Sequence, residues 1–415
     1  MTRAPTGRPT VPGSPNVPDM PEGSDVPGSP NVAGAPGVQR APDRPSVPGI
    51  PGIPGDSSVP GRPDVADGLD VPHVRLAGDP AEIGRRHGAA RAPQLRAFLD
   101  DGLARLNHLR PANAAPFTLD DLGPTITAHR EAVEGQTPDL AAEIRGLAEG
   151  AGLTADEAML LQIRREVMGY SRIPTRGDCT TYARAGEVVA QTVDLNGDLD
   201  DQIAVLEITP AGSARRSLIL SFAGLLGYLG MNSAGLAIGL NLLLGGTWRP
   251  GLPPYLAIRH LLDNAASVDE ALTILAGLEL SSSRSLTLCS PGKAAYVEIL
   301  DDRTRVTEAP WTVHTNHYLH PDLAPDDEIN VFARNSSQRR LDACAERLTA
   351  LPPSAAPEEH FALLSAPPIC VPDDGDIRLE RTVAAVVMRP DQGRMYVRPG
   401  DPSHPGTRTH TFALD

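Results

Sequence analysis

Cysteine, positive charge and long apolar runs are all scarce in this chain. Its 415 residues contain four cysteines without CxxC spacing, too few and too scattered for a disulfide scaffold. The formal net charge of -15 argues against nucleic acid or an anionic membrane as a partner. No segment is long and uncharged enough to cross a bilayer, and the first residues lack the apolar core of a signal peptide. We therefore expect a cytoplasmic protein that binds neither nucleic acid nor membrane.

Aromatic residues are nearly absent from residues 1–72, which are instead dense in proline and glycine. Imperfect repeats such as "VPGSPNVPDM" and "VPGIPGIPGD" cannot bury enough apolar surface to offset the conformational entropy of an ordered chain. A collagen helix would need glycine at every third position, and that spacing breaks down at once. The pattern predicts a disordered tail.

Helix signals dominate residues 73–178. Asp79 is a predicted N-cap, followed by a first-turn proline and a carboxylate at the third position. Two further helices are expected to begin at Thr137 and Thr154, while Pro93 is expected to kink or divide the first helix. This region is therefore predicted to be a helical layer.

Strand signals dominate residues 179–415. Runs rich in β-branched residues include "RSLILSFAGLL", "SLTLCS" and "TVAAVVMRPDQGRMYV". A helical stretch interrupts them at "PYLAIRHLLDNAASVDEALTILAGL". The second half is predicted to be a sheet-rich region covered by helices, which makes the chain an α+β protein.

One hairpin places a thiol beside a carboxylate. In "RGDCTTYARAGEVVAQTVD", residues 176–194, the pair Gly186-Glu187 fits a two-residue type II′ turn. That register would set Cys179 directly opposite Asp194. The sequence thus predicts a site at this end of the hairpin.

The thiol has no histidine near it in sequence to act as a base. Cleavage of the bond between Asp178 and Cys179 would supply one, because a new α-amino group has an ordinary pKa of about 8. Cys179 would then provide both the nucleophile and the base.

Several ordered motifs carry a family resemblance. "RGDCTTYARAGEVVAQTVDLNGD", "FAGLLGYLGMNSAGLAIGLNLLL", "VHTNHYLHPD" and "TVAAVVMRPDQGRMYVRPGDP" resemble the landmarks of the acyl-coenzyme A:6-aminopenicillanic acid acyltransferase family. The resemblance extends over roughly residues 75–412. It implies an N-terminal nucleophile hydrolase fold, a four-layer αββα sandwich with a helical propeptide region, and a precursor that cuts itself before a cysteine.

The resemblance also implies roles for individual residues. Cys179 matches the family nucleophile, and Asp194 matches the acidic residue that closes the next strand. Asn316 in "HTNH" matches the asparagine that helps to hold the oxyanion, and Thr181 matches a site threonine. The bond between Asp178 and Cys179 matches the bond that is cut.

Two positions depart from the family pattern. The family has an arginine shortly before the late strand, where alignment on Thr382 places Leu379 instead. Arg378 and Arg381 are the neighbouring arginines, and we favour Arg381. Asp178 stands where the penicillin enzyme has glycine, although other N-terminal nucleophile hydrolases are cut after aspartate.

Several of these residues also have a purely structural interpretation. Asp194 could cap a turn, and Asn316 could satisfy backbone groups at a strand end. The other cysteines are expected to be inert core or helix residues, namely Cys289, Cys344 and Cys370. A zinc site in "HTNHYLH" is disfavoured, because His314 and His317 would point to opposite faces of a strand.

The predicted chemistry is acyl transfer through an acyl-cysteine, without a metal or an organic cofactor. Water would resolve the thioester in an amidase, and an amine would resolve it in an acyltransferase. The donor is a small-molecule amide, a peptide-like bond or an acyl-coenzyme A used as co-substrate. The two self-cleaved fragments are expected to stay associated. The alternative is a processing-defective relative that serves as a binding or scaffold protein.

Overall fold

The computed structural model describes residues 68–111, 113–168 and 179–414. All of these residues belong to one unit of the chain, which begins at residue 62. The predicted tail, residues 1–72, lies almost wholly outside the described residues, as does Asp178 in the predicted cleavage site.

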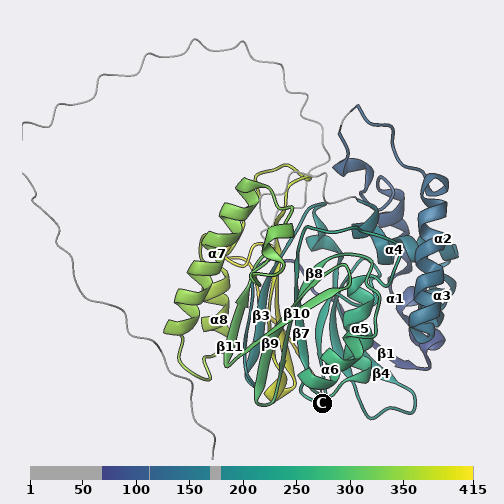
Figure 1. Cartoon of the computed structure of the whole chain (residues 1–415). Coiled ribbons are helices and arrows are strands. Elements are labelled where there is room, and N and C mark those ends of the chain that lie inside the picture. Colours follow the sequence, from purple (N-terminus) through teal and green to yellow (C-terminus); the bar gives the residue numbers. More distant parts are fainter. Residues whose placement is uncertain (1–67, 112, 169–178, 415) are drawn as a thin grey trace, which may run out of the picture. The chain divides into compact units, whose positions relative to one another are not determined.

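Two β-sheets form the centre of the structure (Figure 1). The eight-stranded sheet consists, in spatial order, of β1 (His73–Gly78), β4 (Ile203–Pro210), β5 (Ser217–Phe222), β6 (Leu229–Asn232), β7 (Ala237–Leu242), β8 (Arg284–Ser290), β9 (Lys293–Leu300) and β10 (Arg303–Ala309). The six-stranded sheet consists of β11 (Trp311–His314), β2 (Thr181–Arg184), β3 (Val188–Leu195), β12 (Arg381–Arg389), β13 (Arg394–Pro399) and β14 (His410–Ala413). Neighbouring strands are antiparallel except β1 and β4.

Helices cover the outer face of each sheet. The helices are α1 (Pro80–Asp100), α2 (Leu119–Gln136), α3 (Pro138–Ala151), α4 (Ala155–Val167), α5 (Pro254–Asn264), α6 (Val268–Leu275), α7 (Val331–Ala350) and α8 (Pro357–Leu364). Helices α7 and α8 pack on the six-stranded sheet, and α5 and α6 pack on the eight-stranded sheet (Figure 1). Helix α1 packs on β1 and β4 of the eight-stranded sheet, and α2 to α4 pack with α1 in one helical group. The predicted four-layer αββα sandwich is confirmed, because each sheet buries one face on the other and one face on helices.

The helical layer of residues 80–167 begins its helices where the sequence indicates. Asp79 accepts a hydrogen bond from the Glu82 N–H at 2.8 Å, and Thr154 forms a capping box. Thr137 stands at the N-cap of α3 but makes no capping bond through its side chain. Pro93 lies inside α1 and does not divide it.

Four glycines allow α1 and α3 to pack backbone against backbone. A Cβ atom on Gly84 would lie 2.0 Å from the Glu143 carbonyl oxygen, and one on Gly146 would lie 2.1 Å from the Ala81 carbonyl oxygen. Gly88 and Gly150 meet the facing backbone in the same way. The close contact between α1 and α3 therefore requires that these four residues have no side chain, and it holds the two helices rigidly together.

The hairpin of β2 and β3 differs from the prediction by one residue. Arg184 pairs with Val188, so the loop has three residues, and Gly186 takes the positive φ of 69° at the third position of the turn. The Ala185 N–H donates to the Pro310 carbonyl at 2.9 Å, so Ala185 is held outside the β2–β3 ladder. The predicted type II′ turn is wrong, because it placed glycine at the second position of the turn.

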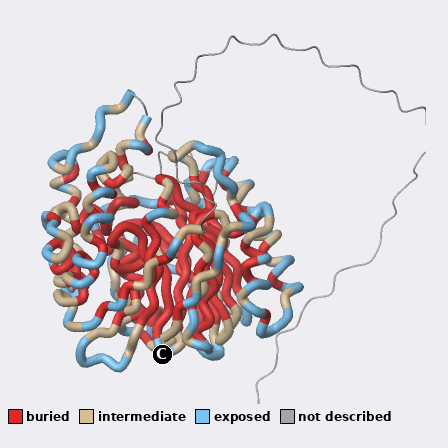
Figure 2. The backbone as a smooth tube through the Cα atoms, turned by 180° about the vertical axis from the view of Figure 1, so that it is seen from behind, coloured by how far each residue is buried: buried red, intermediate tan, exposed pale blue. Residues whose placement is uncertain are grey.

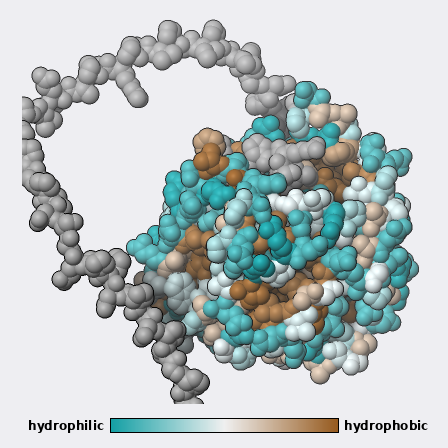
Figure 3. Space-filling view, viewed as in Figure 1, coloured by the Kyte–Doolittle hydropathy of each residue, from teal (hydrophilic) through white to brown (hydrophobic). Residues whose placement is uncertain are grey.

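Buried residues concentrate between the two sheets and between each sheet and its helices (Figure 2). Every residue of β3 and β12 is buried, as expected for central strands covered on both faces. The face in Figure 3 is mostly hydrophilic with scattered apolar side chains. No helix within the described ranges is long and apolar enough to cross a membrane.

Candidate active site

Cys179 lies two residues before β2 starts at Thr181, at the junction of the two sheets, and is only 2% exposed. The Asp194 N–H donates to its sulfur at 3.4 Å, and the Tyr228 hydroxyl oxygen lies 4.0 Å from the same sulfur. The predicted proximity of Cys179 and Asp194 therefore holds, although the hairpin register differs. The contact is made by the main chain of Asp194 instead of its carboxylate.

The carboxylate of Asp194 is fully buried and held by hydroxyl groups. Thr382 Oγ1 donates to Asp194 Oδ1 at 2.7 Å, and Thr192 Oγ1 lies 3.4 Å from Oδ2. Thr382 is the register partner of Asp194 on β12. A central strand thus fixes the carboxylate from the side opposite the hairpin through the hydroxyl of Thr382.

Two side chains that the sequence analysis missed bind the carbonyl oxygen of Cys179. Asn241 Nδ2, from β7, donates to it at 2.8 Å, and Arg340 Nη1, from α7, donates to it at 2.9 Å. Arg340 also donates to Thr180 Oγ1 at 3.1 Å. These bonds fix the main chain at the residue on which the predicted cleavage and nucleophilic attack both depend.

Arg340 connects Cys179 to Asn316. Its Nη2 donates to Asn316 Oδ1 at 2.7 Å, while Asn316 Nδ2 donates to the Leu242 carbonyl at 3.1 Å. Because a guanidinium can only donate, it fixes the amide with its oxygen toward α7 and its NH2 group toward β7. The structure thus brings together the predicted nucleophile and the predicted oxyanion residue.

Thr181 and Arg381 occupy other positions. Thr181 Oγ1 lies 3.4 Å from the Leu240 carbonyl, so its described contact joins the two sheets. Arg381 binds three aspartates, with nitrogen to oxygen distances of 3.0 Å to Asp198, 2.7 Å to Asp200 and 3.5 Å to Asp373.

Within the described residues, no contact joins Arg381 to Cys179, Asp194 or Asn316. Arg378 pairs with Asp376. The arginine that contacts the predicted site residues is Arg340.

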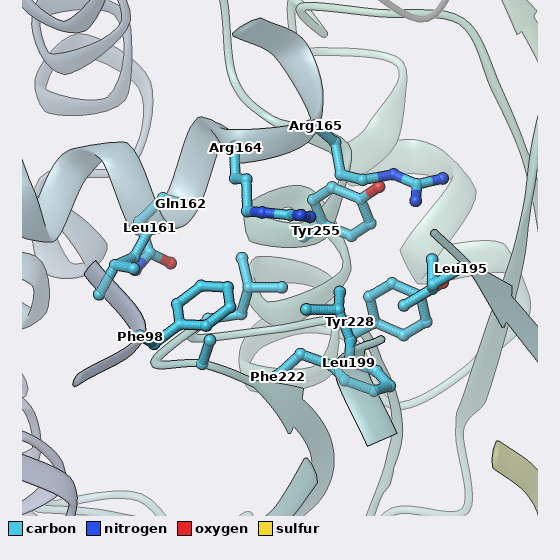
Figure 4. A pocket seen from close by; sticks show the side chains of 12 residues that line it. Phe98, Leu161, Gln162, Arg164, Arg165, Leu195, Leu199, Phe222, Tyr228 and Tyr255 are labelled. Atoms are coloured by element: carbon cyan, nitrogen blue, oxygen red, sulfur yellow. The ribbon is translucent and has the colours of Figure 1, made fainter. Parts of the chain in front are cut away.

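An apolar pocket lies beside Tyr228, which neighbours Cys179 (Figure 4). It holds about 390 Å³ of space between atoms, part of it open to solvent, and is lined by Phe98, Leu161, Gln162, Arg164, Arg165, Leu195, Leu199, Phe222, Ala223, Leu225, Tyr228 and Tyr255. Tyr228 belongs both to the pocket wall and to the surroundings of the Cys179 sulfur, and its ring stacks on Tyr255 with centroids 5.3 Å apart. Residues from before and after the predicted cleavage point build this pocket together.

The other cysteines lie in settings that suppress thiolate formation. Burial raises the pKa of Cys289 to about 11 and that of Cys370 to about 12, and it raises the pKa of Cys344 well above its usual value. In the part of the chain that the structure describes, no group of three or more His, Cys, Asp or Glu side chains is arranged to hold a metal ion.

The sequence indicates the two missed residues, Asn241 and Arg340, with signals of different strength. Asn241 is the one polar side chain in the apolar run "GLAIGLNLLL", so its position in a buried strand is a usable signal. Arg340 lies on the face of α7 that also carries Ser337, Cys344 and Leu348, all buried. A charge on an otherwise small and apolar helix face is a signal too, but a weaker one.

Comparisons with known proteins agree with the motifs. The sequence profile of the family "Acyl-coenzyme A:6-aminopenicillanic acid acyl-transferase" matches residues 182–404. The chain is 26% identical over 260 residues to the acyl-coenzyme A:6-aminopenicillanic-acid-acyltransferase 40 kDa form of Emericella nidulans, covering 60% of this chain and 69% of that protein.

Two solved structures show more distant similarity. Penicillin V acylase from Agrobacterium tumefaciens is 18% identical, with a TM-score of 0.42 over 57% of this chain and 86% of the acylase. The Caenorhabditis elegans N-acylethanolamine-hydrolyzing acid amidase ortholog is 17% identical, with a TM-score of 0.39 over 57% of this chain and 100% of that chain.

Proposed function

Because the chain belongs to the acyl-coenzyme A:6-aminopenicillanic acid acyl-transferase family, we propose that it is a self-processing enzyme that transfers or hydrolyses acyl groups through an acyl-cysteine at Cys179. The observation that carries the proposal is the convergence on this one residue of the Asp194 N–H, Asn241 and the Arg340–Asn316 pair.

Self-cleavage is the first proposed step. The Cys179 thiol attacks the carbonyl carbon of Asp178, the peptide bond breaks as its nitrogen takes up a proton, and water hydrolyses the resulting thioester. The donors on the Cys179 carbonyl hold the residue in place while this bond changes. The product is a Cys179 that carries a free α-amino group.

Acyl transfer is the second proposed step. The α-amine accepts the thiol proton as sulfur attacks the acyl carbonyl, and Asn316 Nδ2 stabilises the oxyanion of the tetrahedral intermediate. The ammonium then returns its proton to the departing amine. Asp194 orients the ammonium, since its carboxylate is buried and its own N–H donates to the sulfur.

The apolar pocket beside Tyr228 is proposed to hold the acyl group. Water would then release a free acid, and a bound amine would give a new amide. The acyl donor is a small molecule, and acyl-coenzyme A is one of the candidates. Since Phe98 and Arg164 lie upstream of Cys179, both fragments must remain associated to keep the pocket intact.

The alternative is a processing-defective relative that serves as a binding or scaffold protein. The contacts of Arg340 with Cys179 and Asn316 favour the enzyme.

Two mass measurements test the proposal. The first compares the purified chain, 43.8 kDa when intact, with fragments whose amino-terminal sequence should begin at Cys179. The second maps the adduct left by a thiol-directed acyl analogue, which is expected on Cys179. A folded and active protein that stays uncut would refute the amine as base.

A further inference from the structure

A buried histidine–glutamate contact joins the two sheets close to Asn316. Glu298 lies on β9 of the eight-stranded sheet, and His314 ends β11 of the six-stranded sheet; both side chains are fully buried. His314 Nε2 lies 2.9 Å from Glu298 Oε1, and the Tyr296 ring packs edge-on against the imidazole with centroids 4.9 Å apart. The proposed chemistry uses neither of the paired groups.

The surroundings of the pair fix the charge of Glu298. His314 Nδ1 lies 2.8 Å from the Thr315 carbonyl, which can only accept a hydrogen bond, so Nδ1 carries a proton. Burial raises the pKa of Glu298, but His314 and the N–H groups of Leu319 and His320 outweigh burial and hold that pKa below its usual value. The Glu298 carboxylate is therefore held in its charged form by the His314 ring and by two main-chain N–H groups.

The Glu298 carboxylate also contacts both ends of the turn that carries Asn316. His314 enters this turn, while the N–H groups of Leu319 and His320, at its exit, donate to Glu298 at 2.6 and 2.9 Å. Ser337 Oγ accepts the Asn316 N–H at 2.8 Å in the middle of the turn. One side chain of the opposite sheet thus binds both ends of the turn, which fixes the main chain that presents the Asn316 amide.

We propose that Glu298 and His314 are positioning residues for the Asn316 amide, so that the oxyanion donor is held in place by their hydrogen-bonded contact between the sheets. The inference rests on the proposed function, because it needs Asn316 to stabilise an oxyanion. An oxyanion donor acts only in the transition state and must be placed within a fraction of an ångström. Loosening the turn therefore lowers kcat and leaves KM nearly unchanged.

The test uses the full processed protein and the p-nitrophenyl ester of a short acyl chain. Glu298→Gln keeps the shape of the side chain but removes the charge that holds His314. We expect kcat to fall about 10-fold to 100-fold, since a displacement near 1 Å costs up to this much. The matched control is Glu143→Gln, which removes a buried carboxylate bound to Arg259 at 2.9 Å in the helical layer and should leave kcat within about 3-fold of the parent.

A double-mutant cycle separates positioning from general destabilisation. In an Asn316→Ala background, Glu298→Gln is expected to cause little further loss of kcat, because the amide that it positions is already gone. The double variant Glu298→Gln/His314→Gln should fold, since it leaves no unpaired buried charge, and should recover part of the kcat lost in Glu298→Gln.

The outcomes distinguish the two proposals. Parent protein that shows no acyl adduct on Cys179 would overturn the proposed function, and the positioning role falls with it. An adduct together with a strong effect of Asn316→Ala, but additive losses from Glu298→Gln, would overturn the positioning role alone. Equal losses of kcat in Glu298→Gln and Glu143→Gln would do the same.

Discussion

The two sides of Cys179 carry side chains of opposite charge, a carboxylate on one side and a guanidinium on the other. On the side of β3 and β12, a carboxylate, Asp194, is held by the neutral hydroxyl of Thr382. On the side of β7 and α7, a guanidinium, Arg340, binds the neutral carbonyl of Cys179 and the amide of Asn316. The proposed reaction forms a cationic ammonium and an anionic oxygen together. The carboxylate on one side would stabilise the ammonium, and the donors on the other side would stabilise the anionic oxygen.

Replacing Cys179 removes the residue that both sides contact, and so has the largest expected effect. Cys179→Ala should abolish both self-cleavage and acyl adduct formation. Cys179→Ser should process slowly, because a hydroxyl has a much higher pKa than a thiol and is the weaker nucleophile here. Gel mobility and intact mass measure processing, and normal cleavage of Cys179→Ala would rule out this nucleophile.

Replacing Arg340 breaks only the donor side. Arg340→Met removes bonds to Cys179, Thr180 and Asn316, and is expected to lower kcat/KM about 100-fold to 1000-fold, as when an oxyanion donor is lost. The free energy of unfolding should also fall by roughly 2–3 kcal/mol, because hydrogen bonds to charged groups contribute about that much.

The controls for Arg340 are its own neighbour and the arginine favoured from the sequence. Arg339→Met alters an exposed residue of the same helix and should behave as the parent does. Arg381→Met breaks the pairs with Asp198 and Asp200, so it should affect stability more than turnover. A larger loss of turnover in Arg381→Met than in Arg340→Met would show that Arg381, and not Arg340, is the arginine that serves the active site.

Replacing Asp194 tests the carboxylate side. Asp194→Asn keeps an oxygen that can accept from Thr382, so the fold should persist. Turnover and processing are expected to fall about 10-fold to 100-fold, because the carboxylate no longer orients the ammonium. Steady-state kinetics and the fraction cleaved are the measurements, and parent-like values would reduce Asp194 to a structural residue.

The smallest effect is expected at the remaining cysteines. Single replacements by alanine at Cys289, Cys344 and Cys370 should retain both cleavage and labelling. Their raised pKa values keep these thiols protonated at pH 8, and a protonated thiol is a poor nucleophile. Peptide mapping of the adduct is the readout, and an adduct on one of the three with Cys179 unmodified would contradict the assignment.

The sequence predicted what depends on neighbours along the chain. Asp79 and Thr154 cap helices because a cap needs only the next three residues. Cys179 and Asp194 came together because one short hairpin joins their strands, and even a one-residue error in the register left them in contact. The helical first part and the sheet-rich second part also followed from local patterns, whereas the four-layer order was implied by the family resemblance.

Only the tertiary structure decided which distant side chains complete the site. Arg340 is one of several arginines in α7, and its place on the buried helix face separates it from its exposed neighbour Arg339 but does not show that it binds Cys179. Asn316 gained its orientation from the same arginine, and Glu298 reached its turn from the other sheet. Each of these contacts joins separate layers, and the packing of the layers is determined by the summed burial of the whole chain, which no short segment encodes.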